Sequence, residues 1–482
     1  MAKAKQFTRT AKVPRSRSVG PHTADEFQDA ADSEEDRAGK WRLGDPAKSG
    51  RAFVRALEIY DGGLQKHPSN FDLAYNKARL ELEISQRPVL VAHVGLPLID
   101  WLKQTLESHR YALRLNEQNP EALFNTSQVL TSLAEQLSEA GDASTAVPLL
   151  QEALELLSAC CSRQEMLLEQ QQADFGDADE GEISLDSEEP LSPATGLEEG
   201  EQMATIESPV TASDLLDTMH ASLSALTTLV AIVEHHALDT LGDMAQSLTE
   251  SRAPVYVGML PEDAMTAARF ALALDRANFV AAFADAQFTA GMIEIETYLT
   301  RLDGVFSIPN KDEDTVALSS EAEARTELVL SAITRHGNAM ELAADMCWKQ
   351  LKLAQECYTK MSKLEPSAQL YLARGDVEML RHRIAIQPDA KLADSVRKSA
   401  PTLAQNAQTY YKGSIRLATD EDENVRSKAL RRLDVSGCVR ALVHGVGTTE
   451  PPNQEMLHQA LAECVEEGLM DVSLAEGIAS KA

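Results

Sequence analysis

Apolar residues recur at three- and four-residue spacing along most of the chain from about Glu35 onward. This spacing puts the apolar side chains on one face of an α-helix, whereas a half-buried strand alternates apolar and polar residues. We find no convincing alternation in the sequence. The pattern therefore predicts an all-α fold built from amphipathic helices.

Gly-Asp pairs divide the helical stretches at four places. A glycine can end a helix by adopting the left-handed backbone conformation, and an aspartate can then cap the start of the next helix. Short turns of this kind join helices that run in opposite directions, so we predict a chain of antiparallel helix pairs. The four pairs are Gly44-Asp45, Gly141-Asp142, Gly242-Asp243 and Gly375-Asp376.

Two segments lack the helical pattern. Residues 1–34 are polar with few apolar anchors, and residues 170–209 combine glycine and proline with many carboxylates. Such compositions bury too little apolar surface to offset the entropy lost on ordering, so we predict that both segments are disordered. The helix that follows the acidic insertion is predicted to begin with Ser213 as its N-cap.

These boundaries predict the organisation of the chain. Residues 420–482 are expected to cap the end of the helical array, with helices at Asp422–Leu433, Asn453–Leu469 and Val472–Ile478. The predicted segments are the disordered N-terminal segment (1–34), a first set of helices (35–169), the disordered acidic insertion (170–209), a second set of helices (210–419) and the capping helices (420–482).

The second helix of several predicted pairs carries a recurring set of side chains. A small residue is followed at fixed spacing by a large residue, a second small residue and a proline. The small residues let two helices approach closely, the large one fills the groove between pairs, and proline ends the helix. The set appears as Ala56, Tyr60, Gly63 and Pro68, as Ala354, Tyr358, Met361 and Pro366, and more weakly as Ala146, Leu150 and Ala153.

These residues resemble the second helix of the tetratricopeptide repeat family, with Met361 as a departure from a small residue. Three junctions also align, because Asn70, Asn119 and Asn278 each lie in a predicted turn and precede an aromatic residue of the next helix. The resemblance implies a superhelix of antiparallel helix pairs. The superhelix is expected to be irregular, since the junctions do not follow the 34-residue period of the family.

The resemblance also implies that the first helix of each pair lines a concave groove for peptides or folded partners. The same side chains are equally compatible with ordinary consensus residues that bind no specific ligand. Asn76, Lys77 and Arg79 only partly match the set with which some members clamp a C-terminal carboxylate, so we do not predict a clamp. The residues implied to line the groove are Tyr75, Asn76, Arg79, Phe124, Asn125, Gln128, Phe283 and Gln287.

Charge is unevenly distributed along the 482 residues, which hold 45 basic and 75 acidic side chains and a net charge of −30. So acidic a chain repels phosphate backbones, which disfavours direct binding to nucleic acid. Residues 1–22 contain basic residues and no acid, whereas 20 Asp or Glu and no Lys or Arg occur between Arg163 and Arg252. The candidate carboxylates for binding a basic client are Asp177, Asp179, Glu180, Glu182, Asp186, Glu188 and Glu189.

An acidic insertion within repeats resembles the members of the family that escort basic proteins such as histones or ribosomal proteins. Flexible carboxylates can neutralise a basic client while the groove supplies shape-specific contacts. We therefore predict a non-catalytic protein-binding adaptor, and most specifically a chaperone of a Lys/Arg-rich client. Two alternatives stay open: a generic scaffold or co-chaperone in complex assembly, and an enzyme with an unrecognised site.

Motifs for nucleotide or zinc-protease chemistry are absent, and we predict no cofactor and no metal. His235 and His236 are adjacent, and adjacent helical residues point about 100° apart, so the two do not readily share an ion. Cys160-Cys161 is interpreted as a buried helix end. The cysteines lack Cys-x-x-Cys spacing, and no stretch is long and apolar enough to span a bilayer. We expect a nuclear or cytoplasmic protein that does not enter a membrane, and leave its oligomeric state open.

Overall fold

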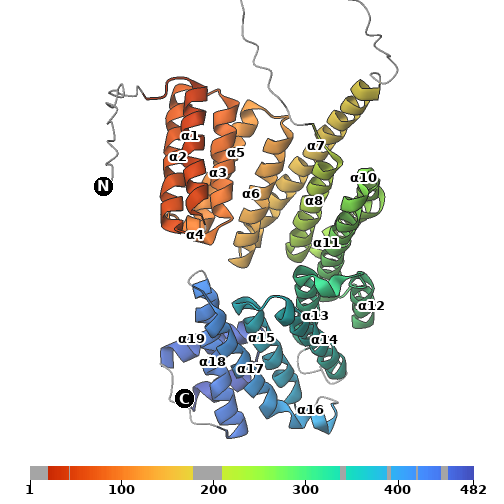
Figure 1. The fold of residues 1–482 in the computed structure, drawn as a ribbon. Helices are drawn as coiled ribbons and strands as arrows, with labels where there is room; N and C mark the ends of the chain where they lie inside the picture. Colours follow the sequence, from red (N-terminus) through yellow and green to blue (C-terminus); the bar gives the residue numbers. More distant parts are fainter. Residues whose placement is uncertain are drawn as a thin grey trace, which may run out of the picture. The chain divides into compact units, whose positions relative to one another are not determined.

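The structure is a computed structural model that describes residues 20–42, 44–176, 209–336, 343–387, 392–419, 422–446 and 454–481. Every regular element among these residues is a helix, which confirms the predicted all-α fold of helix pairs. The chain divides into two compact units, unit 1 (Met1–Val129) and unit 2 (Leu130–Ala482). The boundary between them falls inside α6 (Pro120–Glu139), so each unit is described separately (Figure 1).

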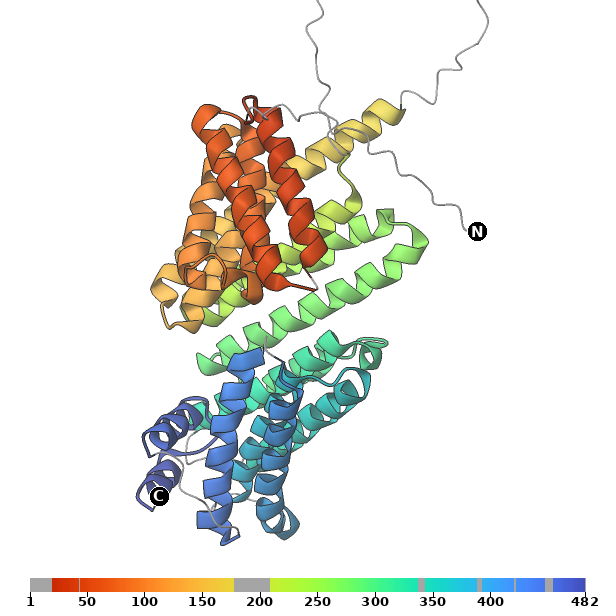
Figure 2. The same cartoon turned by 60° about the vertical axis from the view of Figure 1, so that its left-hand side comes forward.

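The helices of unit 1 alternate in direction and lie side by side (Figure 2). α1 packs most extensively on α2, and α3 on α5. Side-chain caps begin several of these helices: the Asn70 Oδ1 atom accepts from the Leu73 N–H at 2.8 Å, and Asn119 Oδ1 accepts from the Ala122 N–H at 2.9 Å. The helices are α1 (Ala24–Trp41), α2 (Pro46–Lys66), α3 (Phe71–Ser85), α4 (Pro88–Val91), α5 (Leu98–Leu115) and the first part of α6.

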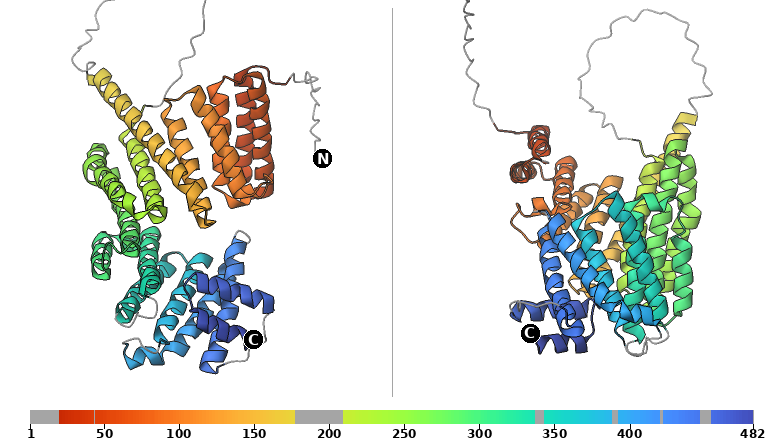
Figure 3. Two further views of the ribbon diagram at one scale, coloured as in Figure 1. Left: turned by 180° about the vertical axis from the view of Figure 1, so that it is seen from behind. Right: turned by 60° about the horizontal axis from the view of Figure 1, so that its bottom comes forward.

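Unit 2 continues the pairing, and α13–α14, α15–α17 and α17–α18 are its most extensive helix contacts (Figure 3). In the described part of unit 2, the 3-10 turns η1 and η3 and the π-helical turn η2 interrupt the α-helices. The elements are α7 (Ala143–Gly176), α8 (Ala212–Ile232), η1 (His235–Ala237), α9 (Leu238–Gln246), η2 (Ser247–Arg252), α10 (Ala253–Met259), α11 (Glu262–Thr289), α12 (Ile295–Val305), η3 (Lys311–Glu313), α13 (Thr315–His336), α14 (Ala344–Leu364), α15 (Ala368–Ala385), α16 (Asp394–Lys398), α17 (Ala400–Leu417), α18 (Glu423–His444), α19 (Gln454–Glu466) and α20 (Val472–Ala479).

The prediction of disorder through residue 34 is wrong where α1 forms, while residues 1–19 lie outside the described part. Thr23 and Glu26 make a capping box at its start, each side chain accepting a hydrogen bond of 3.2 Å from the other residue's N–H. A few apolar side chains then suffice to dock the helix, because its opposite face is exposed. The buried anchors are Phe27, Ala31 and Ala38.

The acidic insertion is shorter than predicted, because α7 runs to Gly176 and α8 is capped by Thr211 and not by Ser213. The Thr211 hydroxyl oxygen accepts from the Asp214 N–H at 3.3 Å, and Asp214 accepts in return from the Thr211 N–H. Residues 177–208 lie outside the described part. The helices on either side of the insertion pack together, and Thr218 on α8 donates a hydrogen bond to Gln164 on α7 at 2.8 Å. Both helices belong to unit 2, so the boundary between the units does not lie at the insertion, where the sequence predicted a division.

The recurring small and large residues occupy helix contacts, as their pattern predicts. Ala56 and Tyr60 are fully buried, as are Ala146 and Leu150 on α7. A Cβ atom at Gly63 would lie only 3.0 Å from the Leu73 side chain. The small residues therefore set how closely successive helices approach.

Two of the four Gly-Asp pairs separate helices as predicted. Gly141 has a φ of +82°, in the left-handed region, and the Asp142 carboxylate then accepts from the Thr145 N–H at 3.2 Å at the start of α7. The Asp45 carboxylate likewise accepts from the Lys48 N–H at 3.0 Å at the start of α2.

The other two Gly-Asp pairs lie inside helices, which corrects the prediction. A Cβ atom at Gly375 in α15 would lie 2.3 Å from Tyr411 Cε1, and one at Gly242 in α9 would lie 3.0 Å from Phe283 Cζ. These glycines admit a bulky neighbour from another helix. Sequence spacing does not distinguish this use of glycine from a helix end.

The helices predicted between residues 422 and 478 all form. α18 extends past the predicted end at Leu433 to His444, because Gly437 stays helical and Gly445, with a φ of +66°, ends the helix. α19 and α20 pack against α18. These elements complete the hydrophobic core of unit 2.

A histidine pair, of which His382 is buried and His444 partly exposed, makes unit 2 sensitive to acid. His382 Nε2 lies 2.8 Å from His444 Nε2, and burial followed by the neighbouring His444 lowers the pKa of His382 to about 4. The folded state thus favours the neutral ring of His382. The contribution of this preference to the free energy of unfolding is complete above the unfolded pKa and is lost as the pH falls through about 6.5 toward 4.

We expect the free energy of unfolding to fall by about 2 kcal/mol more between pH 7 and pH 5 in the wild type than in His382→Gln. Chemical denaturation of both proteins at the two pH values measures the difference. His458→Gln, on the exposed side of α19, is the matched control and should retain the wild-type pH dependence. Equal pH dependence of His382→Gln and wild type would contradict the prediction.

Candidate functional site

Several residues predicted to line a groove converge on one surface of unit 1, to which α1, α3 and α6 contribute. Their side chains are polar and partly exposed, and they bond to one another. We call this surface the α1–α3–α6 face and define it by Gln28, Asp32, Glu35, Tyr75, Asn76, Arg79, Glu83, Glu121 and Asn125.

Tyr75 joins α3 to α6. Its hydroxyl donates to the Glu121 carboxylate at 2.8 Å and accepts from the Asn125 amide at 3.0 Å. Burial, and then the adjacent Glu121 carboxylate, raise the pKa of Tyr75, so the phenol stays protonated and keeps its donor. The ring stacks on Phe71, with centroids 5.6 Å apart, which leaves an aromatic surface beside the polar groups.

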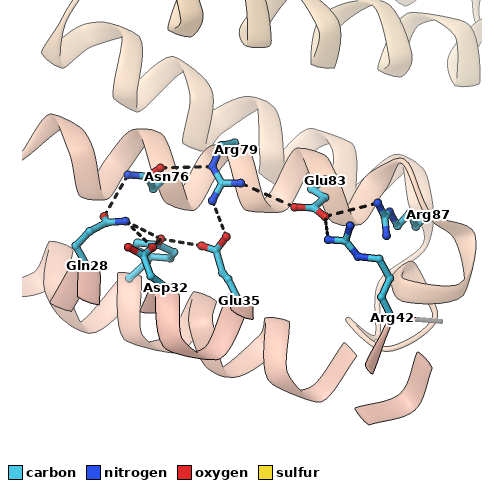
Figure 4. A network of polar contacts seen from close by, with 9 residues as sticks. Gln28, Asp32, Glu35, Arg42, Asn76, Arg79, Glu83 and Arg87 are labelled. Carbon is cyan, nitrogen blue, oxygen red and sulfur yellow. Dashed lines mark hydrogen bonds and ion pairs between the residues drawn. The ribbon is translucent and has the colours of Figure 1, made fainter. Parts of the chain in front are cut away.

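Asn76 and Arg79 join α3 to α1 (Figure 4). The Asn76 amide donates to Gln28 Oε1 at 3.2 Å, and its own oxygen accepts from Arg79 Nε at 3.4 Å. Arg79 Nη2 then donates to Glu35 at 2.6 Å. Two predicted residues, Asn76 and Arg79, are thus held by α1, whose residues up to 34 the sequence interpretation had assigned to a disordered segment.

The same row of charges continues along α3. Glu83 lies 3.9 Å from Arg79 and 3.7 Å from Arg87, and it also pairs with Arg42 beyond the end of α1 (Figure 4). Four-residue spacing places Arg79, Glu83 and Arg87 on one side of the chain as it leaves α3. Carboxylates and guanidinium groups alternate along this row, so it can bind backbone amides or charged side chains.

A buried tyrosine supports the α1 side of the face. Tyr60 on α2 donates to Glu35 at 2.8 Å and also lies within hydrogen-bond distance of Asp32 and Gln28. Burial, and then the Glu35 charge, raise the pKa of Tyr60, which keeps its hydroxyl protonated. The repeat residue that fills the groove between helices therefore also fixes the orientation of Glu35.

The other two predicted residues of α6, Phe124 and Gln128, are half-buried and four residues apart. This spacing places them on one side of the helix. Lys77 is separate from its neighbours on α3, because its amine lies 2.6 Å from Asp61 and 3.7 Å from Glu81. Lys77 therefore does not join Asn76 and Arg79.

Phe283 and Gln287 belong to unit 2, and the turn predicted before them at Asn278 does not form. α11 continues through Asn278, because an asparagine with no nearby glycine or proline weakens a helix by only a few tenths of a kcal/mol. Phe283 stacks on Phe279, and buried Gln287 accepts from Arg301 at 2.5 Å. Both line a pocket of about 440 Å³ between α9, η2, α11 and α12.

The seven acidic residues predicted to bind a basic client lie outside the described part of the chain. They are Asp177, Asp179, Glu180, Glu182, Asp186, Glu188 and Glu189. The acidic residues on α1 were missed as contributors to the site. The capping-box pair Thr23 and Glu26, followed by Phe27, was the sequence signal for that helix.

Within the described residues, no group of three or more His, Cys, Asp or Glu side chains is arranged to hold a metal ion. Cys160 and Cys161 are buried, as interpreted from the sequence, but they lie inside α7 and not at a helix end. Burial raises the pKa of Cys161 to about 11 although Arg252 donates to its sulfur at 3.0 Å. In the same part of the chain, no helix combines the length and apolarity needed to cross a membrane.

Comparisons with known proteins give limited similarities. No family model matches the chain. It is 34% identical over 143 residues to UPF0656 protein C926.02 of Schizosaccharomyces pombe, a match that spans 30% of this chain and 31% of that protein. A circular tandem repeat protein with novel repeat topology and enhanced subunit contact surfaces aligns over 95% of this chain and 99% of its own, with 15% identity and a TM-score of 0.29. The tetratricopeptide resemblance stays a prediction.

Proposed function

We propose that the protein is a non-catalytic, tetratricopeptide-like adaptor that escorts a Lys/Arg-rich protein in the nucleus or cytoplasm. The α1–α3–α6 face is the observation that carries this proposal. Its side chains come from three helices, stay partly exposed and are held in place by one another, as between Arg79 and Glu35 at 2.6 Å. Polar groups fixed before binding lose little side-chain entropy on binding, which favours recognition of a protein partner.

The charge of α1 supports a basic partner. Its sequence contains seven acidic and two basic residues, and most of the acidic side chains are exposed. The Asp32 carboxylate accepts hydrogen bonds from the uncharged groups of Gln28 and Tyr60, so its negative charge remains available to a partner cation. The 20 acidic residues without Lys or Arg between Arg163 and Arg252 add to the same preference.

Affinity capture of the full chain from its own cells, with mass spectrometry at two salt concentrations, tests the proposal. We expect Lys/Arg-rich partners that are released as the salt rises from about 50 to 500 mM. Asp32→Lys should weaken the affinity for the main partner about tenfold by calorimetry, because a like charge is placed in the interface.

Glu58→Lys is the matched control for Asp32→Lys, since Glu58 is exposed on α2, which contributes no residue to the α1–α3–α6 face. It changes the net charge equally and should leave the affinity unchanged. The escort proposal fails if the partners are not basic proteins, or if neither the salt concentration nor Asp32→Lys changes the amount of partner captured.

A generic scaffold is the second candidate, favoured by the stacked Phe71 and Tyr75 rings at the edge of the polar face. Aromatic surface binds partners through apolar contacts that salt does not weaken. In that case several unrelated partners would remain bound at high salt and to Asp32→Lys. They would no longer bind when Tyr75 and Phe124 are both changed to Ala. Retention after those changes would rule against the scaffold.

A further inference from the structure

A second and larger pocket lies within unit 2 and shares no residue with the α1–α3–α6 face. The end of α8, η1 and α9 line it together with α11, α12 and α13, and its volume is about 850 Å³. Pockets of this size are typical of ligand sites in proteins. α11 and its C-cap residue contribute Ala281, Ala282, Ala286 and Ala290, whose short side chains leave the space open.

Negative charge dominates the lining of this pocket. Its carboxylates come from three separate segments, and no Lys or Arg is among the lining residues. Like charges in a partly enclosed space reinforce one another and concentrate cations. The carboxylates are Glu234 before η1, Asp285 on α11, and Glu323 and Glu327 one turn apart on α13.

A third carboxylate of α13, Glu321, is neutralised by ion pairs within the chain. Glu321 is buried and pairs with Arg325 at 2.7 Å and with Lys311 at 2.5 Å. Among the described residues, by contrast, Asp285, Glu323 and Glu327 form no ion pair with Lys or Arg. The two sides of α13 thus differ: one is neutralised within the chain, and the other presents its charge to the pocket.

The hydrogen bonds of the pocket carboxylates do not neutralise them. Asp285 accepts from the Tyr298 hydroxyl at 3.2 Å, and Glu323 accepts from the Ser319 hydroxyl at 2.7 Å. Burial raises the pKa of Asp285, and burial together with the Asp285 charge raises the pKa of Glu327. A cation placed between Asp285 and Glu327 would stabilise both carboxylates and lower both pKa values.

We propose that this pocket binds an arginine side chain of the protein partner. A planar guanidinium group donates paired hydrogen bonds to carboxylates and is less strongly hydrated than an ammonium group, which suits a partly buried site. Val230, Val233 and the alanines of α11 offer apolar contacts to its aliphatic stem. The volume exceeds that of one side chain, so flanking residues of an extended segment also fit.

This proposal deepens the proposed function and rests on it, because it names the side chain by which the basic partner is recognised. The probe is a fluorescent hexapeptide with one central arginine, compared with peptides in which citrulline or lysine replaces that arginine. Citrulline keeps the shape of arginine and removes the charge. Anisotropy titrations use the full chain at about 50 mM salt, where charge effects are large.

We expect the arginine peptide to bind at least about tenfold more tightly than the citrulline peptide. The double variant Asp285→Asn/Glu327→Gln should remove this preference without affecting the citrulline peptide. Asp345→Asn/Glu356→Gln is the matched control, since both carboxylates are exposed on α14 and the loss of charge is equal. Circular dichroism should show that both double variants are folded. If the double variant does not fold, Glu323→Gln serves as a milder pocket variant, because Glu323 is exposed. It is also expected to weaken binding of the arginine peptide.

Three results would overturn the pocket assignment: equal binding of the arginine and citrulline peptides, an unchanged preference in Asp285→Asn/Glu327→Gln, or lysine binding as tight as arginine. If the pocket variants bind normally while Asp32→Lys still releases the basic partner, the pocket proposal fails and the escort proposal stands. If arginine selectivity depends on the pocket but no basic partner is captured from cells, the escort proposal fails instead.

Discussion

Arg432→Met is expected to lower the free energy of unfolding of unit 2 by about 3–5 kcal/mol, because it removes one member of a buried charge cluster. Arg432 is only 2% exposed, and its guanidinium group lies 2.5 Å from Glu467 and 3.8 Å from Asp376. Asp376 also accepts a hydrogen bond of 2.8 Å from Tyr411. The substitution leaves this partly buried carboxylate without its cation.

The pKa of Asp376 indicates how the effect depends on pH. Burial raises this pKa to about 6 even though Arg432 partly offsets it. Because this pKa is raised in the folded state, the charged Asp376 carboxylate lowers the free energy of unfolding at pH values above the unfolded pKa. Lowering the pH through the folded pKa protonates the carboxylate and removes this loss. The loss caused by Arg432→Met should therefore be smaller at pH 5 than at pH 7.

Chemical denaturation followed by circular dichroism measures this loss. Arg431→Met is the neighbouring control, since Arg431 pairs with Glu463 at 2.8 Å on a partly exposed surface and should contribute about 1 kcal/mol or less. Adding Asp376→Asn to Arg432→Met should recover part of the stability. A loss in Arg432→Met no larger than that in Arg431→Met would contradict the cluster's role.

Gly375→Ala is expected to destabilise unit 2 by about 2–3 kcal/mol, because the added methyl group meets a packed aromatic ring. A Cβ atom there would lie 2.3 Å from Tyr411 Cε1. Tyr411 is fully buried and is held by its hydrogen bond to Asp376, so it has little room to move. The contact is reciprocal, since Gly413 of α17 would bring a Cβ atom within 2.5 Å of Tyr371 on α15.

Gly304→Ala provides the control for Gly375→Ala. Gly304 lies in α12, and a Cβ atom there would have no neighbour within 4 Å, so helix propensity should make the change neutral or stabilising by up to about 1 kcal/mol. Thermal denaturation should therefore move the two variants in opposite directions. Wild-type stability of Gly375→Ala would show that α15 and α17 can separate, contrary to the close packing described.

The candidate site was only partly predictable. Tyr75, Asn76, Arg79 and Asn125 could be selected because a repeat pattern fixes which positions of a helix pair face outward. The pattern does not reveal what those positions contact, and the bonds to Gln28 and Glu35 depend on α1 docking beside α3. At Asn278 the pattern was wrong, because Asn70 and Asn119 have helix-ending neighbours in their turns and Asn278 does not.

The sequence alone determined the helical class, the helix starts at Asp45 and Asp142, the turns at Asn70 and Asn119, and the presence of three helices after residue 420, because periodicity and capping depend on residues a few positions apart. It also identified the side chains that let helices approach closely. The tertiary structure decided that α1 joins the core, that Gly375 admits Tyr411, and that Asp285 and Glu327 line one pocket. Those features are contacts between residues far apart in the chain, and local spacing carries no information about which distant surface a side chain meets.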